Sequence, residues 1–345
     1  MRTLLLWLLL SLSALGAEPV EALHLLCWSE YVPQSVLDGF TKRTGAPVLV
    51  EYYSTNDQLL ERLRARPGYY DVIQPSGYYV RTLAQAGGLE PLDPAHLRNL
   101  GNLDPSFRHL SFDPDGKYSV PWLAGTVGIV TNTDLVKQPP TSFAQVFDGS
   151  HRAKIVVVDD AREIVAWALT AVGRPITDVS AAALHEVEPL LRNWLPQVAL
   201  FDSDSPRSAL LDGRAEVGII WSGEAALLWQ ANHKFRFALP STGVHMFVDN
   251  LAIPKGAPHR ELAESFIDYC LAPEVSASIS RAYPYTNPNV AARRLLSTEE
   301  LANPASYPPG ISELPMLRND GNTPEAVTEF VRRLRQELDA DLKAH

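Results

Sequence analysis

The sequence predicts an α/β fold of two lobes that enclose a cleft, on three observations. Short apolar segments typical of strands alternate with amphipathic segments typical of helices, which is the pattern of a mostly parallel sheet with helices on its faces. This alternation breaks in a loop-rich middle and then restarts. The 345-residue chain is long enough for two domains. We therefore expect two lobes, each a mixed, mostly parallel sheet flanked by helices.

The first series holds three strands and three helices. Gly45 and the pair Pro67-Gly68 are stop signals for the first two helices. The N-cap of the second helix is Ser54, Thr55 or Asn56. The predicted strands cover 23–28, 46–53 and 70–76, and the predicted helices cover 33–45, 54–68 and 78–88.

The second series is longer. Its predicted strands cover 124–132, 153–160, 198–204, 216–221 and 234–243. Its predicted helices cover 141–149, 161–173, 179–196, 205–215, 222–232 and 323–344, and a further helix at 259–273, where Pro273 is a stop signal, follows the return to the first series. A segment at 249–256 leads back to the first series. We therefore expect one lobe at 23–127 plus 250–300 and the other at 128–249 plus 301–345.

The first 22 residues have the pattern of a secretory signal peptide. Arg2 precedes an apolar run from Leu4 to about Leu15, and small residues follow this run. The run is short for a membrane helix, which needs ~20 apolar residues. We expect a cleaved signal peptide at 1–22 and an exported protein, with an uncleaved anchor as the alternative.

The composition argues against several classes of function. A formal net charge of −10 disfavours nucleic acid and anionic lipid as partners. With only Cys27 and Cys270, the chain is not a disulfide-dense scaffold, and either one bridge or two buried thiols is possible. The nine histidines show no metal-ligand spacing, so we expect neither a metal nor a cofactor.

Aromatic and acidic side chains recur where the predicted strands end. In open α/β sheets, ligands bind outside the carboxyl ends of the strands, beside helix N-termini. No serine–histidine or cysteine–histidine pairing recurs at these positions. The candidate site residues are Trp28, Ser29 and Tyr31; Ser76 and Tyr78; Asp160 and Glu163; Trp221 and Glu224; Phe247 and Asp249; and, further along, Tyr285.

This combination of side chains suits an organic cation. Aromatic faces attract ammonium and methylene groups, and carboxylates take the charge. Since removing a carboxylate from water costs several kcal/mol without a counter-charge, acids in a cleft favour a cationic ligand. Structural roles are the alternative: Asp160 and Glu163 match a helix capping box. Likewise, Trp221 is compatible with a core position and Glu224 with a first-turn helix charge.

At these positions the sequence resembles the periplasmic spermidine/putrescine-binding proteins that serve bacterial ABC importers. Six segments carry the likeness, in the family's order, over about 270 residues: CWSEYVPQSVLDGFTKRTG, YDVIQPSGYYV, VVDDAREI, IIWSGEAA, VDNLAIP and NPNVAARRLLS. The resemblance implies the two-lobed periplasmic-binding-protein fold, whose lobes close on a ligand. It also implies a periplasmic monomer that captures a polyamine and delivers it to an ABC transporter permease in the inner membrane, without being an enzyme.

The resemblance further implies a role for each candidate residue. Asp249 would be the central acid for a terminal ammonium group, and Glu163 with Asp160 would bind an amino group from the other lobe. The aromatic and polar lining would be completed by Trp28, Tyr31, Trp221 and Tyr285 and by Ser29, Ser76 and Tyr78.

Some residues depart from one branch of the family and bear on the ligand. Phe247 and Glu224 resemble the putrescine-preferring branch, whereas the segment DDARE resembles the spermidine-preferring branch. Arg318 falls near a glutamine that contacts the ligand in the spermidine branch, and Arg207 follows a Ser-Asp-Ser-Pro turn expected near the cleft. An arginine inside the cleft would favour a short diamine or an ω-amino acid zwitterion. The alternative is an ion pair with a neighbouring acid, Glu224 or Asp249.

Two other classes of function receive less support. Tyr78, Tyr79 and His245 are possible ligands for ferric iron, yet adjacent helical residues point about 100° apart, which weakens shared ligation. Acid pairs also serve in catalysis, but the sequence has no nucleophile elbow, phosphate loop or metal motif.

Overall fold

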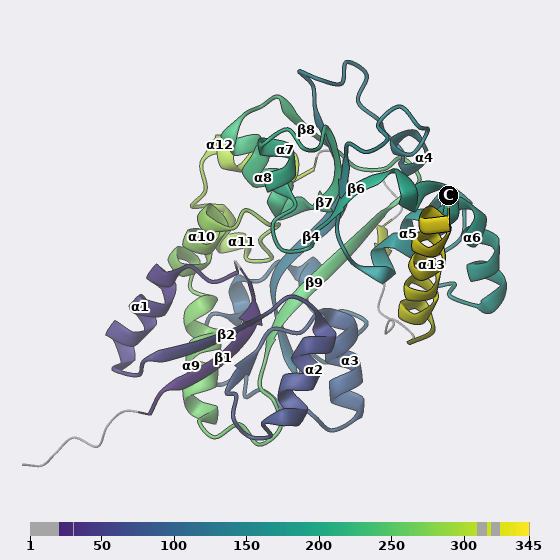
Figure 1. Ribbon diagram of the computed structural model, residues 1–345. Coiled ribbons are helices and arrows are strands. Elements are labelled where there is room, and N and C mark those ends of the chain that lie inside the picture. The colour runs from purple at the N-terminus through teal and green to yellow at the C-terminus, as the bar shows by residue number, and fades with distance from the viewer. Residues whose placement is uncertain (1–20, 30, 309–315, 319–324, 345) are drawn as a thin grey trace, which may run out of the picture.

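The computed structural model describes residues 21–29, 31–308, 316–318 and 325–344 (Figure 1). The predicted signal peptide lies almost wholly outside these residues. The described chain forms two α/β lobes, drawn one above the other in Figure 1, and strands β4 (Ser119–Asn132) and β9 (Val244–Ala252) run between them. Among the described helices, none has both the length and the apolar character that crossing a membrane requires.

The lower lobe in Figure 1 contains the first series of elements. Its strands are β1 (Leu23–Trp28), β2 (Val48–Tyr53) and β3 (Val72–Ile73). Its helices are α1 (Gln34–Thr44), α2 (Asn56–Ala65), α3 (Gly77–Gln85) and α9 (Arg260–Cys270). Two short 3₁₀ turns, η1 (Leu100–Asn102) and η2 (Pro105–Phe107), lie in the loop-rich middle.

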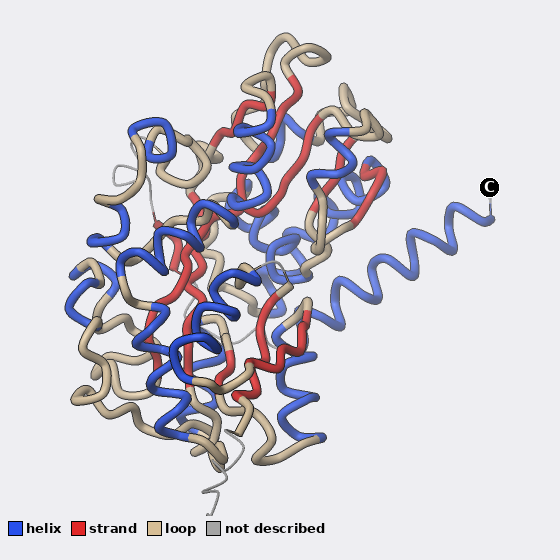
Figure 2. The backbone as a smooth tube through the Cα atoms, turned by 90° about the vertical axis from the view of Figure 1, so that its left-hand side faces the viewer, coloured by secondary structure: helices blue, strands red, loops and turns tan. Residues whose placement is uncertain are grey.

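The upper lobe contains the second series. Its strands are β5 (Ile155–Val157), β6 (Val198–Phe201), β7 (Val217–Trp221) and β8 (Phe235–Ala238). Its helices are α4 (Phe143–Val146), α5 (Ala161–Ala171), α6 (Ala181–Trp194), the 3₁₀ turn η3 (Leu195–Gln197), α7 (Arg207–Leu211), α8 (Ser222–Ala231) and α13 (Glu325–Ala344). In Figure 2 the C-terminal end of α13 leads away from the body of the molecule. The elements α10 (Pro273–Ala282), α11 (Val290–Arg293), α12 (Thr298–Leu301) and β10 (Met316–Arg318) complete the described structure.

The strands are connected by hydrogen bonds in the order β2-β1-β3-β9-β4-β7-β5-β6, with β8 beside β4 and β10 beside β9. Pairing is parallel at both ends of this order, in β1 with β2 and β3 and in β5 with β6 and β7. It is antiparallel in the middle, where β4 pairs first with β9 and then with β7 and β8. Because β4 changes partners along its length, it connects the two lobes directly.

The buried apolar side chains form two main clusters in the lower lobe and one in the upper lobe. Strand β1 shows the two-residue period of a sheet covered on both faces: Leu25 and Cys27 enter one core of the lower lobe, and Leu26 enters another. The upper core gathers side chains from β5, β7, α5 and α6, and α13 contributes Phe330 and Leu334. The helices therefore cover both faces of the sheet, as the alternating pattern predicts.

Local signals position the helix ends. Thr55 is the cap of α2, because its hydroxyl accepts the backbone N–H of Gln58 at 3.2 Å. Gly45 ends α1 in the left-handed region at φ 80°, a conformation that glycine adopts without a steric penalty.

The structure corrects several predicted boundaries. Strand β4 begins at Ser119 and not at 124, and its start was hidden by Pro121, which lies at an irregularity in the register with β9. Strand β9 begins at 244 and not at the predicted crossover at 249, whereas β3 is shorter than the predicted strand. Pro273, predicted to end a helix, begins α10, since proline fits the first helical turn.

Both cysteines are free and buried. Cys27 and Cys270 belong to the same core, where burial raises the pKa of each thiol. Of the two possibilities that the sequence left open, the structure has two buried thiols.

Candidate ligand-binding cleft

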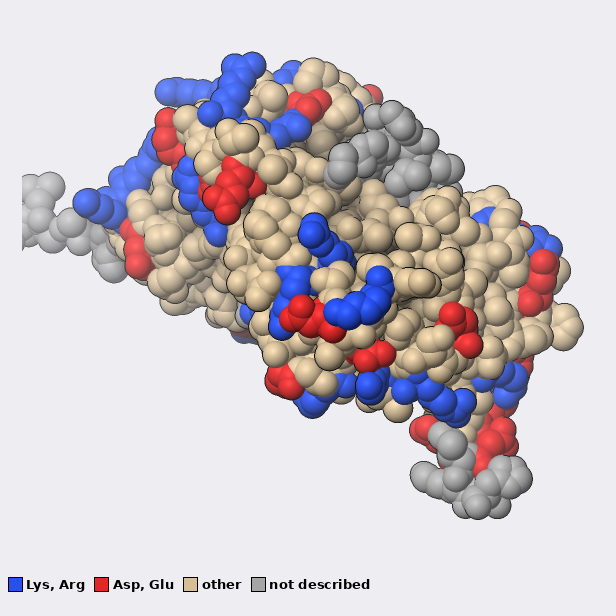
Figure 3. Space-filling view, turned by 90° about the horizontal axis from the view of Figure 1, so that it is seen from above, with Lys and Arg blue, Asp and Glu red and all other residues tan. Residues whose placement is uncertain are grey.

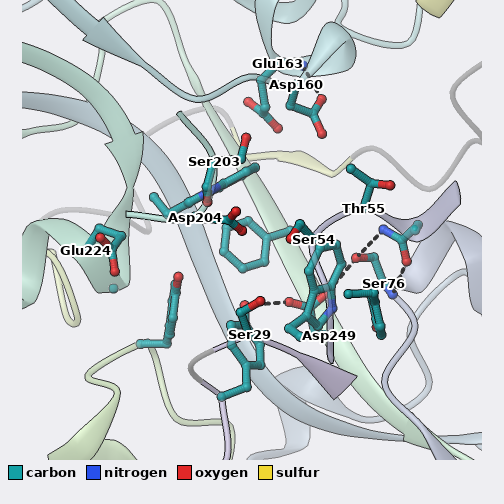
Figure 4. Close-up of a pocket in the computed structure, with 18 of the residues that line it drawn as sticks. Ser29, Ser54, Thr55, Ser76, Asp160, Glu163, Ser203, Asp204, Glu224 and Asp249 are labelled. Carbon is teal, nitrogen blue, oxygen red and sulfur yellow. Dashed lines mark hydrogen bonds between the residues drawn. The ribbon is translucent and has the colours of Figure 1, made fainter. Parts of the chain in front are cut away.

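A cleft lined by residues of both lobes encloses about 940 Å³ when its open mouth is included (Figure 4). Twelve of the thirteen predicted site residues line it: Trp28, Ser29, Tyr31, Ser76, Tyr78, Asp160, Glu163, Trp221, Glu224, Phe247, Asp249 and Tyr285. The other, Arg318, ends β10, whose backbone pairs with β9 at Met246, and its side chain lies outside the described residues.

Asp249, in β9, has its carboxylate held by two hydroxyl groups (Figure 4). The residue is 2 % exposed. Tyr31 donates to its Oδ2 at 2.8 Å, and Ser76 donates to its Oδ1 at 2.6 Å. The backbones of Ser76 and Asp249 also form an isolated antiparallel bridge, which fixes the two side chains side by side. Asn56 donates at 3.0 Å to Ser76 Oγ and to the hydroxyl of Tyr78.

The charge of Asp249 is poorly compensated by the protein. Within the described part of the chain, Asp249 forms no salt bridge with a lysine, arginine or histidine. Burial raises the pKa of Asp249 to about 6, although the donors Ser76 and Tyr31 and the more distant charge of Arg162 act in the opposite direction. A cation bound beside this carboxylate would supply the missing counter-charge.

Asp160 and Glu163, at the start of α5, form only half of the capping box that their spacing suggests. Asp160 is the N-cap, and its Oδ1 accepts the backbone N–H groups of Arg162 and Glu163 at 2.9 and 3.0 Å. Burial and the nearby charge of Glu163 raise the pKa of Asp160. The side chain of Glu163 does not return to the cap but contacts His245. The capping interpretation therefore holds for Asp160 alone, and both carboxylates line the cleft.

Glu163, His245 and Arg162 form a connected group on this wall. Nδ1 of His245 lies 2.5 Å from Oε1 of Glu163, and Nη2 of Arg162 lies 3.0 Å from Nε2 of His245. Burial acts to raise the pKa of Glu163, but His245 and Arg162 outweigh it and hold that pKa below its usual value. The guanidinium of Arg162 also lies over the ring of Tyr78, 4.1 Å from its centroid.

Glu224 and Arg207 pair with each other, the alternative raised from the sequence. Arg207 lies at the start of α7, and its Nη1 donates to Oε1 of Glu224 in the first turn of α8. Glu224 lines the cleft, whereas Arg207 reaches it from outside the lining. The prediction of an ion pair between these residues is confirmed.

Aromatic rings form a continuous wall along the cleft. Neighbouring ring centroids are 4.6 Å apart for Tyr53 and Trp28, and 5.2 Å apart for Tyr31 and Tyr285. The series continues from Tyr285 through Phe247 to Trp221, at 6.0 and 5.5 Å. Trp28 and Tyr31, 6.3 Å apart, join its two parts. Such a wall offers π faces to the methylene and ammonium groups of a chain-like cation.

The electrostatic balance of the lining is negative. Among the residues that the structure describes, six carboxylates line the cleft against a single arginine, Arg162. The outer face seen from above in Figure 3 differs, because basic and acidic side chains are interspersed there. A negative cleft attracts cations and disfavours anions.

The chain matches the sequence model of the family described as "bacterial extracellular solute-binding protein" over residues 35–308. The chain belongs to this family. It is therefore a solute-binding protein and not an enzyme, with a small molecule as its ligand. The two lobes and the cleft between them are the periplasmic-binding-protein fold.

Relatives of this solute-binding protein cover nearly its whole length. The spermidine/putrescine-binding periplasmic protein of Salmonella typhimurium is 32 % identical over 332 residues, 95 % of each chain. The putrescine-binding periplasmic protein PotF of Escherichia coli is 30 % identical over 322 residues, 87 % of this chain and 86 % of the relative. A solved structure from Listeria monocytogenes, described as "Putative spermidine/putrescine ABC transporter", has a TM-score of 0.86 at 28 % identity and covers 92 % of this chain and 98 % of its own.

Several residues lining the cleft of this solute-binding protein were missed in the sequence. The segment from Tyr53 to Asn56 begins at the last residue of β2, so it obeys the same rule of strand ends as the predicted residues. His245 was considered only as a possible ligand for ferric iron, yet it lies two and four residues before Phe247 and Asp249 on β9, and the two-residue period of a strand places all three on one face. Arg162 carried no such signal, because Asp160 and Glu163 account for the segment DDARE as a helix start without any role for the arginine.

The residues considered for a ferric site have other partners. The hydroxyl of Tyr78 accepts from Asn56, and that of Tyr79 donates to Asp57. Tyr79 does not line the cleft, and His245 is engaged by Glu163 and Arg162.

Proposed function

We propose that this solute-binding protein captures a polyamine, putrescine, spermidine or a close cationic amine, in its cleft. The observation that carries the proposal is Asp249, a buried carboxylate that receives hydroxyl donors but no salt bridge from the described residues. An ammonium group would compensate this charge in a site where water cannot. The relatives named for spermidine and putrescine binding support the same class of ligand.

The aromatic wall sets the shape of the ligand. A linear chain of methylene groups can lie along the rings from Trp28 to Trp221, with its first ammonium group at Asp249. Glu163 and Asp160 then face the far part of the ligand from the other lobe (Figure 4). Ser29, Ser76, Tyr78, Phe247, Glu224 and Tyr285 complete the proposed contact set.

The setting of this function is also part of the proposal. The segment 1–22 directs export to the periplasm, where the protein is a monomer that delivers its ligand to an ABC permease in the inner membrane. The lobes are 23–127 plus 250–300 and 128–249 plus 301–345, and they close on the ligand. Closure around the amine excludes water from Asp249, which strengthens the ion pair.

Calorimetric titration with a panel of amines tests the proposal. The panel contains putrescine, spermidine and agmatine as cations and an ω-amino acid as the zwitterionic alternative. We expect at least one cation to bind with a Kd of about 1 μM or tighter. Binding of the ω-amino acid in preference to every amine, or of no amine at all, would refute the assignment. The zwitterion has lost one anchor suggested by the sequence, because Arg207 pairs with Glu224.

A further inference from the structure

His245 contacts the carboxylate of Glu163, which the ligand would otherwise contact on that side. It is 7 % exposed and lines the cleft beside Glu163, which is 2 % exposed. The distance from Nδ1 to Oε1 is 2.5 Å. On the other side of the ring, Nη2 of Arg162 lies 3.0 Å from Nε2. The imidazole therefore bridges a guanidinium and a carboxylate on the wall opposite Asp249.

The position of Arg162 determines the tautomer of His245. A guanidinium only donates hydrogen bonds, so Nε2 is the acceptor in this contact. Nδ1 then carries the hydrogen and donates a hydrogen bond to Oε1 of Glu163, and the imidazole is neutral in this arrangement. The three side chains together carry one positive and one negative charge, so this group is electrically balanced, and the carboxylate of Asp160 lies near it. Asp249 forms no such ion-paired group among the described residues.

We propose that His245 is a specificity-determining residue that sets how strongly the cleft rewards a second ammonium group on the ligand. The inference rests on the proposed function, in which a first ammonium group binds at Asp249. A second ammonium group that reaches Glu163 meets a carboxylate already bonded to an N–H donor, with a guanidinium one residue away. The affinity that this second ammonium group adds, relative to an uncharged group at the same end of the ligand, is therefore reduced. Amines with a single ammonium group should bind this protein nearly as well as diamines.

Matched ligand pairs isolate this effect. Each pair consists of an α,ω-diaminoalkane and the ω-amino alcohol of equal length, with chains of about four to eight carbons. Both members place one ammonium group at Asp249, so the ratio of their affinities cancels that contact and reports on the far end alone. Calorimetry on the full chain at about pH 7.5 gives this ratio for each length.

Three variants separate the hydrogen bond from its surroundings. His245→Phe keeps a ring but removes the donor to Glu163, and His245→Asn keeps an N–H donor near Nδ1. His151→Phe is the matched control, because Nδ1 of His151 lies 2.9 Å from Oε1 of Glu216 in another histidine–glutamate pair, outside the cleft lining. Melting temperatures of the three variants show whether each one folds.

We expect His245→Phe to raise the diamine preference about tenfold or more at the length that reaches Glu163. His245→Asn should restore the wild-type ratio, and His151→Phe should not change it. A ratio within about twofold of wild type at every length in His245→Phe, or an equal rise in His151→Phe, overturns the proposal. If His245→Phe does not fold, the wild-type protein provides the test: a diamine preference below about threefold at every length supports the proposal, and a larger preference overturns it. Failure of both ligands to bind wild type would instead refute the proposed function.

Discussion

The hydroxyl of Tyr31 donates to Oδ2 of Asp249 at 2.8 Å, joining residues 218 positions apart in the sequence. Tyr31 follows the end of β1, whereas Asp249 lies within β9. The contact places an aromatic ring and a buried acid at one point of the cleft.

Tyr31→Phe removes one of the two hydroxyl donors that favour ionised Asp249. A hydrogen bond to a charged group contributes about 1.5–3 kcal/mol, so the pKa of Asp249 should rise by about one unit or more. We expect the pH midpoint of amine binding to rise by the same amount, as measured by titrations across a pH series. Tyr269→Phe, a hydroxyl deletion outside the cleft lining, is the control and should leave the midpoint unchanged. Equal midpoints in wild type and Tyr31→Phe would contradict the assigned role.

Amine binding should release a proton near pH 6. Burial raises the pKa of Asp249 to about 6, so near that pH about half of the ligand-free molecules carry a proton that an incoming ammonium group displaces. Below pH 6 affinity should fall about tenfold per pH unit, and above about pH 8 no proton should be released. Calorimetry in buffers of different ionisation enthalpy measures this release. Proton uptake on binding at pH 6 would show that the sign is wrong.

Gly223→Ala should displace an aromatic ring of the site. A Cβ at Gly223 would overlap the ring of Tyr285, which lies in the wall between Tyr31 and Phe247. We expect amine affinity to fall about tenfold, because the repositioned ring loses contact with the ligand. Gly101→Ala is the matched control, since a Cβ there meets nothing within 4 Å. Equal affinities in the two variants would mean that Tyr285 does not contact the ligand.

Asp160 should contribute to stability as a helix cap. Asp160→Ser keeps an oxygen that can accept the N–H of Glu163, and Asp160→Ala does not. The alanine variant should therefore be less stable than the serine variant by about 1 kcal/mol in urea unfolding. Comparing these two variants removes the effect of the buried charge, because neither carries it. Identical stabilities would indicate that the cap contributes little to folding.

Much of the fold and of the cleft follows from local rules. Strand–helix alternation predicted the elements that carry the cleft, and the rule of strand ends brought Trp28, Ser76 and Trp221 into one lining. The antiparallel middle of the sheet did not follow, because Pro121 hides the start of β4 and register between distant strands leaves no local trace. The sequence left two possibilities open for Arg207, which were a place inside the cleft or an ion pair with a neighbouring acid. The packing of α7 against α8 decides for the ion pair with Glu224.

The bridge from Arg162 through His245 to Glu163 could not be predicted from the sequence. Its residues lie up to 83 positions apart, and their types are individually ordinary. The two-residue period of a strand places His245 on the same face of β9 as Asp249, but it does not say which carboxylate His245 contacts. That depends on the position of α5 relative to β9, which is a property of the tertiary structure.

Asp249→Asn tests the central claim most directly. In ligand-free protein this variant removes a buried charge whose pKa is raised to about 6, a shift worth on the order of 3 kcal/mol against folding at neutral pH. The destabilisation is absent below the usual carboxyl pKa and grows as pH rises toward 6, so at about pH 7.5 the variant should be at least as stable as wild type. Its affinity for putrescine or spermidine should nevertheless fall more than about a hundredfold, since one ammonium group is left without a counter-charge. Calorimetry showing an affinity within about threefold of wild type would contradict the account.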